Sequence, residues 1–120
     1  MKIRFWRLNP YDSKDLYRNA DGDDLFFIHK GSGEFFCDLG NLQFSEGDYI
    51  MVPRGMAWRI KAKEEISAML IEATAAYYSL PDKGILGDHA IIDPSCFRTP
   101  ELNEAFEEQK CREKTKVIIK

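Results

Sequence analysis

A chain of 120 residues, 44% of them hydrophobic, is long enough to bury one core, and we expect a single domain over residues 1–120. Its 17 basic and 20 acidic residues give a net charge of −3, which argues against nucleic-acid and anionic-membrane partners, because both attract a concentrated basic face. No stretch reaches the ~20 apolar residues of a membrane span, and the N-terminus lacks a signal-peptide core. Cys37, Cys96 and Cys111 are odd in number and widely spaced, so we expect reduced thiols and a cytoplasmic protein.

The first predicted elements are short strands separated by turns. Residues 2–8 alternate loosely and are expected to form an edge strand, whereas 9–13 and 17–23 are polar and turn-prone. Apolar runs separated by glycine-containing turns follow at 24–30, 34–39, 42–44, 48–53 and 56–62. Strands this short and evenly spaced, without helices between them, predict an all-β antiparallel sandwich or small barrel.

Side-chain alternation predicts which residues of the run 24–30 face the core. If Asp24 points inward, Phe26 and Ile28 do so too, while Leu25, Phe27 and His29 point outward. Both faces are mostly apolar, as they are in the run 48–53. We therefore expect the outer face to be covered by another sheet, an arm of the chain or another subunit.

The run 56–62 instead has one apolar side and one polar side. Met56, Trp58 and Ile60 share the apolar side, whereas Arg59 and Lys61 lie on the side expected to face water.

The remaining elements surround this predicted barrel. A strand over 66–73 is expected, with an extended continuation over 75–80. Residues 81–93 read as a loop that wraps over the barrel, and Asp93-Pro94 can start a short helical turn. Thr99-Pro100-Glu101 predicts a helix reaching about Cys111, and 115–120 form an apolar terminal strand. The barrel core is thus placed at about 17–80, and the wrapping loop and helix at about 81–112.

Two glycine-containing segments carry a family resemblance. Gly31-Ser32-Gly33-Glu34-Phe35 follows an apolar run, and in the segment 47–55 five residues separate Gly47 from Pro53-Arg54-Gly55. Together they resemble the two motifs of the cupin superfamily. The resemblance implies a cupin-type double-stranded β-helix, or jelly-roll barrel, here with a short C-terminal helix.

The cupin resemblance also implies where a metal would bind. Metal-dependent cupins use an H-x-H pair, a carboxylate and a further histidine, which leave open positions on a non-haem iron. Those positions fall near Arg18 and Ala20, on Asp24 and on Trp58. Because only Asp24 can ligate and Arg18 would repel a cation, we predict neither a bound metal nor a catalytic residue.

Other residues admit a structural and a functional interpretation. His29 and His89 are satisfied polar residues or interface contacts, or else one of them is an acid–base catalyst. Cys37 is a buried strand residue or a nucleophile. The acidic residues around Gly22 either stabilise a turn or bind calcium, although they lack the longer ligand spacing of calcium sites.

A candidate ligand pocket is the last feature predicted from the residues themselves. The interior side chains either plug the barrel or form an apolar pocket for a small aromatic ligand. The predicted pocket-lining residues are Asp24, Phe26, Tyr49, Met56 and Trp58.

A closer resemblance extends from about Tyr17 to Leu102. It is carried by the segments 17–23, 46–49 with 53–55, 70–72, 80–87 with Asp93-Pro94, and Thr99-Pro100. These segments resemble homogentisate 1,2-dioxygenase, a family built as two cupin-like halves with two histidines and a glutamate as iron ligands in the C-terminal half. The part resembled is the N-terminal half, which carries no iron.

This resemblance implies a structural, metal-free half of an aromatic ring-cleaving dioxygenase of tyrosine and phenylalanine catabolism. Such a half would be inactive alone and would bury its strands against a second cupin domain or in a homo-oligomer. Two alternatives stay open: a stand-alone homodimeric cupin that binds a small apolar or aromatic ligand, and a metal-free cupin isomerase using Tyr49 or His29. Whether the chain is an enzyme by itself is therefore left open.

Overall fold

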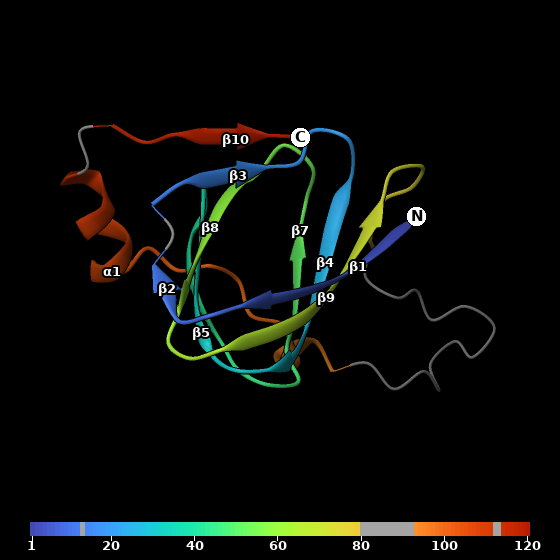
Figure 1. The fold of residues 1–120 in the computed structure, drawn as a ribbon, viewed down its shortest axis with the longest axis horizontal. Coiled ribbons are helices and arrows are strands. Elements are labelled where there is room, and N and C mark those ends of the chain that lie inside the picture. The colour runs from blue at the N-terminus through green and yellow to red at the C-terminus, as the bar shows by residue number, and fades with distance from the viewer. Residues whose placement is uncertain (13, 80–92, 112–113) are drawn as a thin grey trace.

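Two sheets pack face to face in the computed structural model, which describes residues 1–12, 14–79, 93–111 and 114–120 (Figure 1). The four-stranded sheet has the order β1 (Lys2–Leu8), β9 (Ile66–Ala73), β4 (Asp23–Lys30), β7 (Tyr49–Val52). The six-stranded sheet has the order β10 (Val117–Ile119), β3 (Leu16–Arg18), β8 (Ala57–Ala62), β5 (Gly33–Cys37), β6 (Gly40–Phe44), and β2 (Tyr11–Asp12) also pairs with β8. The predicted all-β class is confirmed.

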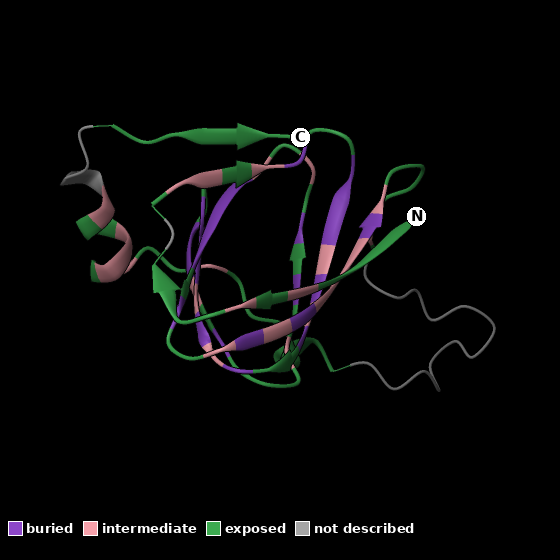
Figure 2. Ribbon diagram, in the orientation of Figure 1, coloured by how far each residue is buried: buried purple, intermediate pink, exposed green. Residues whose placement is uncertain are grey.

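The core lies between the two sheets and is made by alternating residues of both (Figure 2). The four-stranded sheet contributes Phe26, Ile28, Ile50, Val52, Ile66 and Ala68, and the six-stranded sheet contributes Phe35, Cys37, Phe44, Trp58, Ile60 and Ala62. The Trp58 ring lies in the middle, with its centroid 5.1 Å from Phe26 and 5.7 Å from Phe35. The predicted inward face of β4 is thus confirmed.

The turn between β5 and β6 depends on a glycine. Gly40 has φ +138°, and a Cβ at this position would lie 2.5 Å from the carbonyl oxygen of Glu101. Any other residue would therefore be strained by its backbone conformation and would also collide with a neighbouring chain segment.

The sequence pattern predicted most of the strands, but it did not predict the short strands β2 and β3. β2 and β3 lie in or next to segments whose polar residues read as turns, because two or three residues give no periodicity to detect. β2 and β3 form because β8 supplies hydrogen-bond partners to both of them. The predicted terminal strand is present as β10, which pairs in parallel with β3.

The C-terminal helix begins later than predicted. Helix α1 spans Glu104–Glu107, continues as a 3₁₀ helix over Glu108–Cys111, and is capped by Asn103, whose Oδ1 accepts from the N–H of Phe106 at 3.0 Å. Thr99-Pro100 does not start it, because both backbone groups of Glu101 bond to Asn41 and hold this segment extended. The predicted turn at Asp93-Pro94 is confirmed by a 3₁₀ helix at Pro94–Cys96.

The segment after β9 also differs from its prediction. Residues 75–79 form no strand, and Asp23 accepts a hydrogen bond from the N–H of Tyr78 at 3.2 Å. The last residue of that predicted extension, most of the predicted wrapping loop, and His89 lie outside the described residues. In the part of the chain that the structure describes, no helix is long or apolar enough to cross a bilayer.

The prediction that one side of β8 faces water is wrong for Arg59. Arg59 is only 3% exposed, because its guanidinium lies 3.9 Å from the centre of the Phe36 ring. Its Nη1 donates to Asp12 at 2.7 Å, and its Nε donates to Gln109 at 2.8 Å. The C-terminal helical segment therefore covers this side of the six-stranded sheet, while Lys61 stays exposed as predicted.

Candidate functional site

Two neighbouring carboxylates lie inside the barrel at one end of the core. Asp24 on β4 and Glu72 on β9 are direct partners in the antiparallel ladder, so their side chains lie next to each other on the same face. Their exposed fractions are 4% and 0%. Burying two carboxylates side by side is unfavourable unless hydrogen bonds and cations compensate.

Three further residues supply that compensation. Asn19 Nδ2 donates to Asp24 Oδ1 and to Glu72 Oε1, both at 3.1 Å. The ammonium of Lys120, just beyond β10, donates to the same Glu72 oxygen. Arg4 on β1 places Nη2 3.2 Å from Glu72 Oε2, as an ion pair without hydrogen-bond geometry. These five residues, Arg4, Asn19, Asp24, Glu72 and Lys120, form the interior ion cluster.

The two carboxylates differ in acidity. Burial raises the pKa of Asp24, the charge of Glu72 raises it further, and the hydrogen bond from Asn19 offsets only part of this. Burial also acts to raise the pKa of Glu72, but hydrogen bonds from Lys120 and Asn19 and the charges of Lys120 and Arg4 outweigh it and lower the pKa. Glu72 is thus the ionised member that pairs with both cations.

The implied metal positions do not come together as a donor set. Asp24 belongs to the interior ion cluster, Ala20 is exposed, and Trp58 packs in the aromatic core. Among the residues that the structure describes, no three histidine, cysteine, aspartate or glutamate side chains are grouped to hold an ion. With Lys120 and Arg4 beside Glu72, these residues do not fit a histidine-and-carboxylate iron site.

Four of the five predicted pocket residues lie together. Asp24 and Phe26 share the inward face of β4, Trp58 contacts Phe26, and Met56 packs half-buried against the same core. Tyr49 does not join them, because it is 65% exposed on the outer face of β7, with its ring 4.8 Å from Phe27. A pocket role for the inward four stays a prediction.

The residues named for the isomerase alternative face away from the interior. Tyr49 and His29 are both exposed on the four-stranded sheet. Neither reaches the interior ion cluster, and His29 is the one histidine among the described residues, so this part of the chain does not show an inward tyrosine and histidine pair. Cys37 lies in the core, where burial raises the pKa of its thiol, as expected for a structural cysteine.

The acidic residues around Gly22 do not share one role. Asp23 Oδ1 accepts from the Arg54 backbone N–H at 3.0 Å and from Arg54 Nε at 3.2 Å, and Oδ2 accepts from Tyr78. Burial acts to raise the pKa of Asp23, but these hydrogen bonds and the charge of Arg54 outweigh it and lower the pKa. Asp23 therefore anchors loops, as the turn interpretation predicts.

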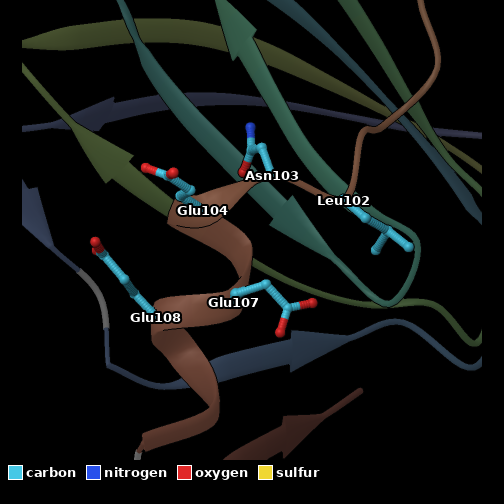
Figure 3. A pocket seen from close by; sticks show the side chains of 5 residues that line it. All are labelled: Leu102, Asn103, Glu104, Glu107 and Glu108. Atoms are coloured by element: carbon cyan, nitrogen blue, oxygen red, sulfur yellow. The ribbon is translucent and has the colours of Figure 1, made fainter.

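A shallow hollow beside α1 is the last candidate site. It is lined by Leu102, Asn103, Glu104, Glu107 and Glu108 (Figure 3). Glu104 and Glu107 extend in different directions, and Asn103 already caps the helix. These carboxylates do not converge on one point, so the hollow has no geometry for a cation or for acid–base chemistry.

Glu72 is the functional-site residue that sequence reasoning missed. The strand 66–73 reads as Ile66, Ala68 and Leu70 on its inward face, and Glu72 continues that face. A charged residue at the end of an inward apolar series was the available signal for a buried ion pair. The identity of its partners had no local signal, since Arg4 and Lys120 come from opposite ends of the chain.

Comparison with known proteins shows the family of this chain. A family model described as homogentisate 1,2-dioxygenase N-terminal matches residues 1–120. Homogentisate 1,2-dioxygenase of Sinorhizobium medicae is 30% identical over 105 residues, which cover 85% of this chain and 23% of that protein. A Saccharolobus solfataricus protein is 34% identical over 70 residues, covering 58% of this chain and 18% of its own length. The chain thus spans about a fifth of the curated relatives it matches.

Solved structures show the fold independently. A cupin protein from Bacteroides fragilis superposes with a TM-score of 0.56 at 14% identity, covering 76% of each chain. At this identity the likeness concerns the fold alone, and it identifies the two packed sheets as a cupin β-sandwich.

Proposed function

Because the chain belongs to the homogentisate 1,2-dioxygenase N-terminal family, we propose that it is a structural cupin domain that supports an aromatic ring-cleaving dioxygenase. The iron and its ligands belong to another part of such an enzyme, and this chain alone does not cleave homogentisate. Its partner is a second cupin domain or a further copy of the chain. We place it in the cytoplasm, in keeping with the unpaired Cys37 and Cys96.

The interior ion cluster is the observation that carries this proposal. In a metal-dependent cupin, the barrel interior presents neutral histidines and a carboxylate with open coordination positions. Here Glu72 is surrounded by Lys120, Arg4 and Asn19, which supply positive charge and hydrogen bonds from the protein itself. A ferrous ion would have to displace an ammonium and a guanidinium, and the residues that the structure describes would offer it no imidazole ligand at this place.

The proposal also gives the domain a physical role. A barrel whose interior is closed by packed aromatics and internal ion pairs needs no cofactor to fold. Such a barrel can present its outer surfaces to a partner as a rigid unit. We therefore treat residues 1–120 as a single domain whose contribution to an enzyme is stability and shape.

Iron loading of the purified chain tests the proposal. The protein is incubated with ferrous iron under nitrogen and desalted, its iron content is measured, and oxygen uptake is followed with homogentisate. We expect no stoichiometric iron and no oxygen uptake. The Asp24→Asn variant is the matched control, because Asp24 is the one implied ligand position with a metal-binding side chain. Stoichiometric iron and turnover that are both lost in Asp24→Asn would refute the proposal.

A further inference from the structure

Strand β10 packs loosely at the edge of the six-stranded sheet. Among the strands that the structure describes, β10 pairs with β3 alone, and it lies at the end of the strand order (Figure 1). The exposed fractions of Val117, Ile118 and Ile119 are 41%, 38% and 63%. Because hydrophobic stabilisation grows with the apolar area removed from water, β10 gains little from packing on the barrel.

Hydrogen bonds and one ion pair therefore hold this strand in place. Backbone hydrogen bonds flank the ladder between β10 and β3: the N–H of Leu16 donates to Lys116 at 2.9 Å, the N–H of Ala20 to Lys120 at 3.1 Å, and the N–H of Lys120 to Arg18 at 3.0 Å. The ammonium of Lys120 also donates to Glu72, whose side chain is fully buried. We call residues 116–120 the strap, and this ion pair ties the strap to the interior ion cluster.

Two buried polar atoms lack a hydrogen bond where the strap docks. Among the described side chains, the buried nitrogen and oxygen atoms without a hydrogen-bond partner are Arg18 Nε and Glu72 Oε2. Arg18 is the ladder partner of Ile119, and Glu72 accepts from Lys120, so both residues contact the strap. A buried polar atom without a hydrogen bond is unfavourable, and for Glu72 the charge of Arg4 offsets part of this. The docked strap thus combines little apolar burial with an unsatisfied donor.

We propose that the strap opens while the two packed sheets stay folded, and that the ion pair between Lys120 and Glu72 is the lock that keeps it closed. In the released state water hydrates Arg18 Nε and the interior ion cluster, and β3 becomes the edge of the six-stranded sheet. The strap thereby governs access both to the edge of β3 and to the buried carboxylates. The inference concerns local opening and does not depend on the scaffold role proposed above.

The packing of the barrel explains why this opening stays local. The hydrophobic core of the described structure takes no residue from the strap. Strand β3 keeps its own ladder with β8, in which Tyr17 pairs with Trp58 and their rings lie 5.2 Å apart. Releasing the strap therefore breaks its ladder with β3 and its ion pair, and it leaves the two sheets and the core in contact.

Hydrogen exchange of the full chain, followed by NMR, tests the proposal amide by amide. Leu16 and Ala20 report on the strap, because their N–H groups donate to its two ends. The amides of β4 and β9, which are the inner strands of the four-stranded sheet, report on global unfolding. After correction for intrinsic rates, Leu16 and Ala20 should exchange together, at least roughly a hundredfold faster than the slowest amides of β4 and β9. Exchange at the global rate, or fast exchange at Ala20 with a protected Leu16, would overturn the proposal, since the strap would then not open as a unit.

Two matched variants test the lock. Lys120→Met keeps an unbranched stem and removes the ammonium, so Leu16 and Ala20 should exchange about tenfold faster or more. Arg4→Met removes the other cation of Glu72, which lies on β1 and stays in place when the strap is released. This control should speed exchange in β4 and β9 without speeding it at Leu16 and Ala20. The lock is refuted if Lys120→Met leaves both strap reporters unchanged, or if Arg4→Met accelerates them equally.

Arg18→Met tests the unsatisfied donor with an effect of opposite sign. It removes Nε and keeps an unbranched stem beside Ile119, so docking no longer buries a donor without a partner. Exchange at Leu16 and Ala20 should become about fivefold slower. Faster exchange at both amides would contradict this reasoning. Circular dichroism checks the fold of each variant, and Lys120→Gln replaces Lys120→Met if the latter does not fold.

Discussion

Replacing Glu72 by Gln should destabilise the fold, whereas replacing its neighbour Asp24 by Asn should not. The two carboxylates lie side by side on β9 and β4, yet only Glu72 contacts both Lys120 and Arg4. Glu72→Gln keeps the size of the side chain and removes the charge that these cations share. Asp24→Asn keeps an oxygen acceptor for Asn19 and removes the carboxylate that burial disfavours.

The magnitude follows from the burial of each partner. Removing one member of a fully buried ion pair costs roughly 3–5 kcal/mol, and a hydrogen bond to a charged group contributes roughly 1.5–3 kcal/mol. The side chains of Lys120 and Arg4 are 38% and 44% exposed, so water screens part of the interaction. We therefore expect Glu72→Gln to lower the free energy of unfolding by about 2 kcal/mol, which for a chain of 120 residues corresponds to roughly 8 °C in Tm. Asp24→Asn should be neutral or stabilising by up to about 1 kcal/mol.

The pH dependence separates these effects from a simple loss of packing. The pKa of Glu72 is lowered in the folded state, so its charge stabilises the fold above the ordinary value of 4.5, and this stabilisation is lost as the pH falls through the folded pKa. Glu72→Gln should therefore match the wild type at low pH. The pKa of Asp24 is raised above 3.8, so any gain from Asp24→Asn is present at neutral pH and disappears as the pH falls towards 3.8.

Urea unfolding followed by the fluorescence of Trp58 and of Trp6, whose rings contact each other, measures both variants at neutral and acidic pH. Equal unfolding free energies for Glu72→Gln and wild type at neutral pH would refute the assignment of Glu72 as the ionised centre of the cluster. A deficit that persists unchanged in acid would show that the substitution disturbs packing and not charge. A large loss in Asp24→Asn would mean that the two carboxylates have exchanged roles.

Two further predictions concern loops that the barrel holds in place. Asp23→Ala removes the acceptor for both Arg54 donors and should lower the free energy of unfolding by about 2 kcal/mol. It should also speed the hydrogen exchange of residues 74–79. Unchanged exchange in these residues would contradict the anchoring role of Asp23. In urea unfolding, Gly40→Ala should lower the free energy of unfolding more than Gly47→Ala does. Both glycines have positive φ, but only at position 40 would a Cβ lie 2.5 Å from the carbonyl oxygen of Glu101. We expect roughly 1 kcal/mol for the Gly47 change from strain alone, and equal losses would rule out the steric argument.

Side-chain alternation was the most informative part of the sequence. The inward assignment of Asp24, Phe26 and Ile28 is confirmed by exposed fractions of 4%, 1% and 0%. Alternation also predicted a second, outward apolar face on β4 and β7, and Tyr49 of β7 is 65% exposed on it. Both features depend on a period of two residues, which is local and needs no knowledge of the fold.

The helix start shows where a local signal gives way to a distant contact. Thr99-Pro100-Glu101 has the composition of a helix N-terminus, yet the helix begins after Asn103. Asn41, which lies on β6, bonds to both backbone groups of Glu101 and keeps it extended. A capping signal describes what a segment prefers in isolation, and the edge of a sheet can satisfy the same backbone groups in a different conformation.

The interior ion cluster could be predicted only in part, and the reason is topological. Asp24 and Glu72 both occupy inward strand positions, so two buried carboxylates were implied by alternation together with the strand pairing. Their cations reach them through long-range pairing: β1 places Arg4 beside β9, and β10 aligns in parallel with β3 and brings Lys120 to the same end of the barrel. A parallel contact between segments about a hundred residues apart leaves no periodic trace in either one. Charge balance was nevertheless a usable constraint, because a barrel that buries two carboxylates without histidines must recruit its positive charge from another part of the chain or from a bound ion.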